Sequence, residues 1–233
     1  MFAHAISLKR PDSLTARVVW LGLCLVLSSC AATRPSTDLP PLTTWELRQA
    51  VLATATDWEF RGRIAVKAGE EGFNGKFHWA QTGHQFYATV SGPLGIGTVI
   101  IEGCEDAMIV TDKDGTRTPL VEPEAELYAR YGWTIPVTSL RYWALGIPDP
   151  SNEAVTDVDD AGKLVGLEQS NWTLSISRYK ESAGQQMPRI LTASNPNTRV
   201  RMVIDKWTFY NKKGPEPFSD KDLRKGLWPL FER

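Results

Sequence analysis

The sequence has few of the side chains that enzymes use for catalysis or for metal binding. Its 233 residues include three histidines and three cysteines. His78 alternates with aromatic residues in the run Phe77-His78-Trp79, and His84 ends a turn-like run at residues 81–84. No nucleophile elbow, zinc-protease helix or phosphate-binding loop occurs. We therefore expect neither an enzyme nor a protein with a metal ion or an organic cofactor.

The sequence also lacks a surplus of basic residues and an apolar run long enough to span a membrane. The 26 Lys and Arg residues do not outnumber the 27 Asp and Glu residues, so no basic surplus favours nucleic acid as a partner. The apolar run at residues 18–27 is too short for a bilayer-spanning helix, which needs about 20 residues. With its basic flank at Lys9, Arg10 and Arg17, this run is typical of a cleaved export signal.

The export signal ends on a cysteine. The pattern Leu27-Ser28-Ser29-Cys30 resembles the bacterial lipobox, in which the thiol is lipidated and the chain is cut just before it. The alternative is a secreted or membrane-anchored protein in which Cys30 is an ordinary thiol. Ala31 stands where an aspartate would favour the inner membrane. We therefore expect residues 1–29 to be a lipoprotein signal peptide and an acylated Cys30 to anchor the chain in the outer membrane.

Removing residues 1–29 leaves 204 residues, which is enough for one domain with a real core. Residues 30–42 are small, polar and proline-rich, and we expect a flexible tether there. The run Thr43-Thr44-Trp45-Glu46 fits a capping box that begins a short helix. We place the domain at residues 43–210 and a C-terminal extension at residues 211–233.

Most of this domain shows the alternation of a β-sheet. Apolar and polar residues alternate from residue 58 to residue 68, as in a strand with one buried and one wet face. Similar runs predict strands at residues 73–81, 85–91, 97–103, 106–111, 116–121, 163–169, 172–179, 188–193 and 199–209, with a helical interlude at residues 122–146. The pattern predicts a mainly β (α+β) fold in which ten or eleven antiparallel strands curl around two or three helices.

One motif allows two interpretations. Asp157, Asp159, Gly162 and Glu168 stand at positions 1, 3, 6 and 12 of an EF-hand calcium loop. Ala161, at position 5, has no side-chain oxygen, and the flanks look like strands rather than helices. A hairpin turn through Asp159 and Gly162 explains the same residues, and we favour the hairpin.

The turn at residues 92–95 has an unusual composition. Gly92, Pro93 and Gly95 define a tight reversal, but its tip is Leu94, where Asn, Asp or Ser would be ordinary. In a generic domain Leu94 would fold back and plug one end of the sheet. Beside a lipid anchor, an outward Leu94 could instead enter the headgroup region, where a buried leucine gains about 1.5 to 3 kcal/mol.

Several short motifs follow one another in the order and spacing of a known family. They are Phe60-Arg61-Gly62-Arg63-Ile64-Ala65-Val66, Phe77-His78-Trp79-Ala80-Gln81, Gly92-Pro93-Leu94-Gly95, Ile135-Pro136-Val137, Leu140-Arg141-Tyr142-Trp143-Ala144-Leu145-Gly146-Ile147-Pro148 and Leu167-Glu168-Gln169-Ser170-Asn171-Trp172. With these motifs and the lipobox, the chain resembles the outer-membrane lipoprotein receptor LolB family over residues 58–207.

The resemblance implies an eleven-stranded antiparallel sheet that curls into an open barrel around an apolar cavity and is covered by helices. In that family the cavity accepts the acyl chains of client lipoproteins from the periplasmic carrier LolA, and the protein inserts them into outer-membrane lipid. The family's membrane-insertion loop maps onto residues 92–95, with its functional leucine on Leu94. We expect a monomer whose domain faces the periplasm and whose transient ligands are acyl chains.

The candidates for the cavity lining are apolar residues of the first three predicted strands. They are Phe60, Ile64, Phe77, Trp79, Phe86 and Ala88. Alternation alone leaves open which face of each strand is inside. The main alternative function is a structural outer-membrane lipoprotein that acts as a scaffold through protein contacts alone, and such a scaffold needs no cavity.

The lipobox predicts the outcome of a substitution at Cys30. The Cys30→Ala protein should carry no palmitate and should either be released as a soluble periplasmic protein or keep its signal, because no thiol remains to be acylated. Metabolic labelling with palmitate, followed by cell fractionation, measures both effects. Persistent labelling of the variant would refute the assignment.

Overall fold

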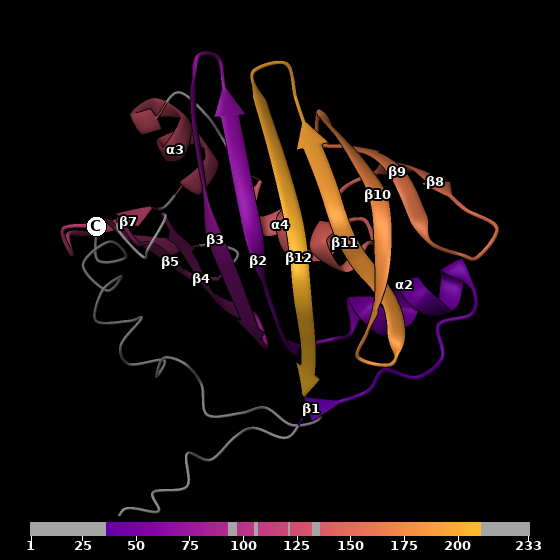
Figure 1. The fold of residues 1–233 in the computed structure, drawn as a ribbon. Helices are drawn as coiled ribbons and strands as arrows, with labels where there is room; N and C mark the ends of the chain where they lie inside the picture. Colours follow the sequence, from indigo (N-terminus) through magenta and orange to yellow (C-terminus); the bar gives the residue numbers. More distant parts are fainter. Residues whose placement is uncertain (1–35, 93–96, 105–106, 121, 132–135, 211–233) are drawn as a thin grey trace, which may run out of the picture. The chain divides into compact units, whose positions relative to one another are not determined.

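The computed structural model describes residues 36–92, 97–104, 107–120, 122–131 and 136–210, and most of them belong to one antiparallel sheet (Figure 1). The strands are β1 (Ser36–Thr37), β2 (Asp57–Ala68), β3 (Glu71–Thr82), β4 (Gln85–Ser91), β5 (Val99–Gly103), β6 (Met108–Thr111), β7 (Arg117–Leu120), β8 (Ala154–Val158), β9 (Leu164–Gln169), β10 (Trp172–Ser182), β11 (Gln185–Ser194) and β12 (Thr198–Tyr210). The helices are α2 (Trp45–Ala53), α3 (Pro123–Tyr131) and α4 (Val137–Leu145).

Eleven of these strands follow one continuous path. Their order is β7-β6-β5-β4-β3-β2-β12-β11-β10-β9-β8, and β1 adds a short twelfth strand beside β12. The two ends of the path, β7 and β8, are not paired with each other, so the sheet curls without closing. This arrangement confirms the predicted fold class, including the two helices between the first and second groups of strands.

In the central strand β2, the apolar residues of the alternating pattern are buried and the polar residues are exposed. Phe60, Ile64 and Val66 are at most 3% exposed, whereas Arg61 and Arg63 are exposed. The apolar face therefore lines the inner side of the curl. A β-carbon added to the glycine at position 62 would lie 2.1 Å from the carbonyl oxygen of a β12 residue, so no larger residue fits where β2 and β12 approach.

Helix α4 lies on the inner side of the curled sheet, behind β12 and β11 in Figure 1. Its buried side chains include Leu140, Trp143 and Leu145, each at most 3% exposed. The helix ends at Gly146, which adopts a left-handed conformation (φ 79°) and donates its N–H to the carbonyl of Trp143. This conformation is the one that a glycine adopts most readily after a helix.

A buried polar cluster ties α4 to the sheet through Gln169 of β9. Its Oε1 accepts hydrogen bonds from Nε1 of Trp143 (2.9 Å) and from the backbone N–H of Asp149 (3.0 Å). Its Nε2 donates to the carbonyls of Asp149 (2.8 Å) and Asn152 (2.9 Å). Three of these four bonds are buried and the one to Asn152 is partly buried, so both ends of the Gln169 amide are satisfied, which makes the helix position specific.

Residues 36–42 differ from the prediction of a tether. Strand β1 pairs with the end of β12, and Leu42 is only 5% exposed. The backbone N–H of Leu42 also donates to Oε1 of Gln185 at 3.1 Å. The tether prediction is wrong for this part of the chain, because backbone pairing and one buried leucine outweigh its polar composition.

The beginning of α2 also differs slightly from the prediction. The N-cap is Thr44, whose side chain accepts a hydrogen bond from the backbone N–H of Leu47 at 3.2 Å. The capping box would have used Thr43 and Glu46. The cap is thus shifted by one residue, although the helix is where the sequence placed it.

The hairpin interpretation of the calcium-like motif agrees with the structure. Strands β8 and β9 pair as antiparallel neighbours, and the backbone N–H of Gly162 donates to the carbonyl of Asp159 at 2.9 Å. The Asp159 carboxylate accepts from the backbone N–H groups of Ala161 and Lys163 and lies 3.2 Å from Nζ of Lys163. The Asp159 carboxylate therefore binds groups of its own turn.

The Gln169 cluster predicts a large loss of stability in Gln169→Leu. Leucine accepts no hydrogen bond, so the indole N–H of Trp143 and the N–H of Asp149 would stay buried without a partner, at a cost of about 3 kcal/mol in the free energy of unfolding. Urea denaturation measures this. The matched control is Gln186→Leu, an exposed position on β11, which should change stability by less than about 0.5 kcal/mol. An equal effect of both substitutions would contradict the role of the cluster.

Candidate functional site

An apolar cavity of about 390 Å³ lies between α4 and the half of the sheet formed by β2 to β6. Its volume falls in the range of about 300 to 1,000 Å³ that is usual for ligand pockets. The described residues on its wall are Ile64, Phe73, Asn74, Phe77, Trp79, Phe86, Ala88, Val90, Gly92, Gly97, Val99, Ile101, Val110, Val137 and Leu140. Asn74 contributes the one polar side chain among these residues, so the wall interacts with a ligand mainly through apolar contact.

The aromatic residues of the wall form a fixed surface. The rings of Trp79 and Phe86 stack with centroids 4.6 Å apart, and Phe77 meets Trp79 edge to face at 6.4 Å. Nε1 of Trp79 donates to Oε1 of Gln81 at 3.2 Å, which satisfies the indole N–H away from the cavity. The rings can therefore present apolar faces to a ligand without an unpaired donor.

Five of the six residues predicted to line the cavity lie on its wall. These are Ile64, Phe77, Trp79, Phe86 and Ala88. The sixth, Phe60, is 1% exposed and packs in the aromatic cluster beyond the cavity, with its ring 5.0 Å from that of Trp207. Phe60 points into the curl as expected, but its neighbours on β12 fill the space in front of it.

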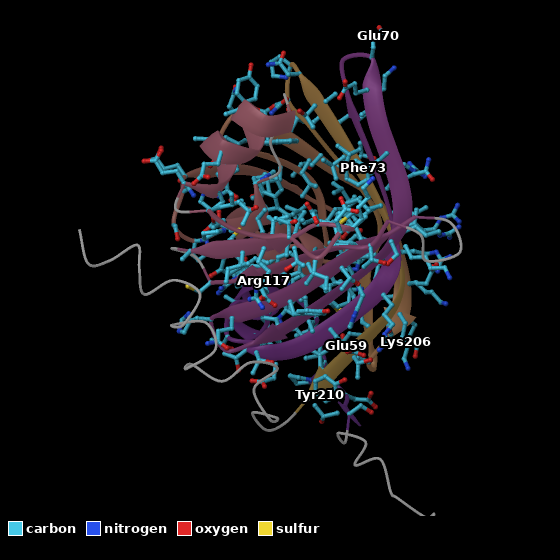
Figure 2. The ribbon with its side chains drawn as sticks, turned by 90° about the vertical axis from the view of Figure 1, so that its left-hand side faces the viewer. Glu59, Glu70, Phe73, Arg117, Lys206 and Tyr210 are labelled. Atoms are coloured by element: carbon cyan, nitrogen blue, oxygen red, sulfur yellow. The ribbon has the colours of Figure 1, made fainter. Side chains whose placement is uncertain are left out.

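Alternation could have identified more of the wall than we predicted. Phe73, Val90, Val99 and Ile101 occupy inward positions on the same or the following strands. Figure 2 shows Phe73 on the inner side of the sheet. The contribution of α4 to the wall carries no such signal, because packing of the helix inside the curl depends on contacts far apart in the sequence.

The predicted insertion loop begins on the cavity wall. Gly92 at the end of β4 and Gly97 before β5 both line the cavity. Pro93, Leu94 and Gly95 lie outside the described residues, as does Cys30. The first residue of this loop and the residue two positions after its end therefore lie beside the apolar volume.

Two features are absent from the described part of the chain. It holds no group of three or more histidine, cysteine, aspartate or glutamate side chains that could bind a metal ion. Among its helices, none combines the length and the apolar character needed to cross a membrane.

Comparison with known proteins identifies the family. The model of the family described as "Outer membrane lipoprotein LolB" matches residues 56–207. The chain belongs to the LolB family. The outer-membrane lipoprotein LolB of Nitrosococcus oceani is 34% identical over 193 residues, which cover 82% of this chain and 95% of that protein. The protein of the same name from Stutzerimonas stutzeri is 31% identical and covers 79% of this chain and 91% of its own length.

Solved structures give a more distant similarity. The LolA superfamily protein NE2245 from Nitrosomonas europaea aligns over 77% of this chain and 99% of its own, with a TM-score of 0.49 and 9% sequence identity. Membership of the LolB family therefore rests on the sequence relatives.

The cavity predicts how an apolar dye should bind. An environment-sensitive dye should bind unacylated protein near one-to-one, and Val90→Trp should weaken this binding at least about tenfold, because the indole would occupy a volume that is otherwise open. Fluorescence titration measures the affinity. The matched control is Thr89→Trp, which adds the same group on the opposite face of β4. Normal dye affinity in Val90→Trp, with its melting temperature unchanged, would show that the dye binds elsewhere.

Proposed function

We propose that this protein receives acylated lipoproteins from the periplasmic carrier LolA and inserts them into the outer membrane. The observation that carries the proposal is the apolar cavity between α4 and strands β2 to β6 in a member of the LolB family. Acyl chains need a dry container in the aqueous periplasm, since each buried methylene contributes about 0.8 kcal/mol. Transfer breaks no covalent bond, so it needs neither a catalytic group nor a cofactor.

Net transfer requires that each acceptor hold the chains more tightly than the donor does. The stacked rings of Trp79 and Phe86 give the cavity an extended apolar contact surface, which supports uptake from a carrier. The bilayer then provides a larger apolar volume than the cavity. A receptor with this role works best at the membrane itself, and acylation of Cys30 would hold the domain on the periplasmic face of the outer membrane.

The loop at residues 92–95 is proposed to make the contact with the bilayer. Leu94 follows two residues after Gly92, which lines the cavity. A leucine inserted at this place would bring the mouth of the cavity against the lipid. The acyl chains could then move from cavity to membrane with little exposure to water.

The substitution Leu94→Glu separates uptake of a client from its insertion. A buried carboxylate in the bilayer costs at most roughly 2.5 to 3.5 kcal/mol, and less near the headgroups. The variant should fold, melt close to the wild type and accept an acylated lipoprotein from LolA, but release it poorly into liposomes. Carrier-to-receptor transfer and receptor-to-liposome transfer, measured separately, test these two steps.

The matched control is Val155→Glu, which places the same charge on an apolar side chain of β8 that is 70% exposed. This variant should take up and release clients normally. Unfolding of Leu94→Glu would instead identify Leu94 as a core residue and remove the insertion role. Failure of the wild-type protein to take up any acylated client would favour a structural scaffold.

A further inference from the structure

The outer face of the central strands is strongly cationic. Outward positions of β2, β3, β11 and β12 carry eight basic residues, namely Arg61, Arg63, Lys67, Lys76, Arg189, Arg199, Arg201 and Lys206. Glu59 and Asp205 are the acidic residues that pair with members of this group. Figure 2 shows Lys206 on the outer side of the sheet, opposite to Phe73. This concentration stands out in a chain whose formal net charge is −1.

A hollow of about 290 Å³ lies within this face, and three of the basic residues surround it. Arg63 of β2 stands directly opposite Lys76 of β3. Ala65, the next outward residue of β2, stands opposite Arg201 of β12. Directly opposed side chains have β-carbons about 4.5 to 5.5 Å apart, and diagonal ones about 7 to 8 Å. The small side chain of Ala65 leaves the space between the three cations open.

The charges around the hollow are incompletely neutralised. Arg63 lies 3.6 Å from Asp205, but Asp205 also pairs with Arg189 at 3.4 Å. Lys76 and Arg201 form no ion pair with another described residue. Like charges in opposed positions destabilise a sheet, so an anion in the hollow would relieve the repulsion between Arg63 and Lys76.

Glu59 provides a negative charge for Arg61 at the other end of the same face. Glu59 accepts a hydrogen bond from Nε2 of His78 at 3.2 Å and lies 3.8 Å from Arg61. The hydrogen bond from His78 lowers the pKa of the Glu59 carboxyl, although its partial burial acts in the opposite direction. Arg61 thus has an acidic partner of its own, whereas two of the three cations around the hollow, Lys76 and Arg201, have none among the described residues.

The hollow and the cavity share three residues, Ile64, Asn74 and Gly92. The cations of the hollow lie on the outer face, whereas the apolar wall of the cavity lies inside the curl, and Gly92 at the start of the loop borders both. A membrane contact through the adjoining loop would therefore bring the three cations to the level of the lipid phosphates. We propose that Arg63, Lys76 and Arg201 bind the phosphate of an anionic phospholipid headgroup while the cavity empties into the membrane. This inference rests on the proposed function, in which the loop meets the bilayer.

The chemistry of these side chains suits a lipid phosphate. The planar guanidinium groups of Arg63 and Arg201 can each donate two parallel hydrogen bonds to phosphate oxygens, and Lys76 adds a compact charge. Each basic side chain near an anionic membrane surface contributes about a fivefold gain in binding. The contact would orient the domain with its loop toward the bilayer, which an acyl anchor at Cys30 alone would not do.

Labelling of lysine amines tests the contact on the complete acylated protein. The protein is anchored in vesicles of phosphatidylcholine alone, or of equal parts phosphatidylcholine and phosphatidylglycerol, and treated with an amine-reactive reagent. Lys76 should react about fivefold more slowly on the anionic vesicles. The exposed Lys180 of β10 is the internal reference and should react at the same rate on both. Equal rates for Lys76 on the two vesicles would overturn the inference.

Two matched double variants test the assignment to these residues. Arg63→Gln/Arg201→Gln should remove the protection of Lys76 by anionic lipid. Lys113→Gln/Arg178→Gln removes two exposed cations elsewhere, one in the turn between β6 and β7 and one on β10, and should keep this protection. Dye binding in the cavity and the melting temperature check that both variants are folded. If both variants lost the protection, the protection would depend on the net charge of the protein and not on these residues, and the proposed site would be wrong.

The remaining outcomes separate this inference from the function on which it rests. Inorganic phosphate, added to phosphatidylcholine vesicles, should not protect Lys76; equal protection would identify a site for free anions and overturn the lipid assignment. If Lys76 is protected but Leu94→Glu delivers clients normally, the insertion role of the loop fails while the phosphate contact stands. If clients are delivered normally and Lys76 is never protected, the function stands and the contact fails.

Discussion

The structure depends on one difference in length: helix α4 is much shorter than the strands of the curled sheet that it packs against. Helix α4 has nine residues and is about 14 Å long, whereas the twelve residues of β2 extend over about 40 Å. Even if it lay along the strands, the helix could cover only about a third of the apolar inner face. Trp58, Phe60 and Trp207 fill one end with closely packed rings. The space that neither the helix nor these rings occupy is the cavity.

This mismatch has functional value only if the helix stays in place, because a sheet that could close over its apolar face would lose the cavity. The hydrogen bonds of Gln169 hold the indole of Trp143 and the segment after α4. A fully satisfied polar group within an apolar core fixes position more than it adds stability, since the same bonds could be made to water in the unfolded chain. The cavity is thus kept open by polar contacts outside its own wall.

Alternation in the sequence was sufficient to predict the long central strands and to make Ile64, Phe77 and Trp79 candidates for the cavity wall, but it left open which face of each strand is inside. It failed where burial follows from distant contacts. Strand β8 is exposed almost throughout, so alternation did not reveal it, and only the hairpin interpretation of the turn at Asp159 implied a strand before that turn. Phe60 looks like a wall residue until the position of Trp207, 147 residues later, is known. Such packing between distant strands has no local signature, and neither has the cationic hollow, whose residues come from β2, β3 and β12.

The cavity and the hollow use opposite faces of β2, so both depend on the register in which β2 pairs with its neighbouring strands. Ile64 lines the cavity and its neighbour Arg63 borders the hollow, so a slip by one residue would put the guanidinium inside and the apolar side chain outside. Close contact at Gly62 with the backbone of β12 opposes such a slip, because Arg61 or Arg63 could not replace a glycine there. An apolar container and a polar contact for the membrane surface are therefore positioned by one strand. Neither can shift along the sheet without the other, which keeps the proposed lipid contact beside the opening through which acyl chains would leave.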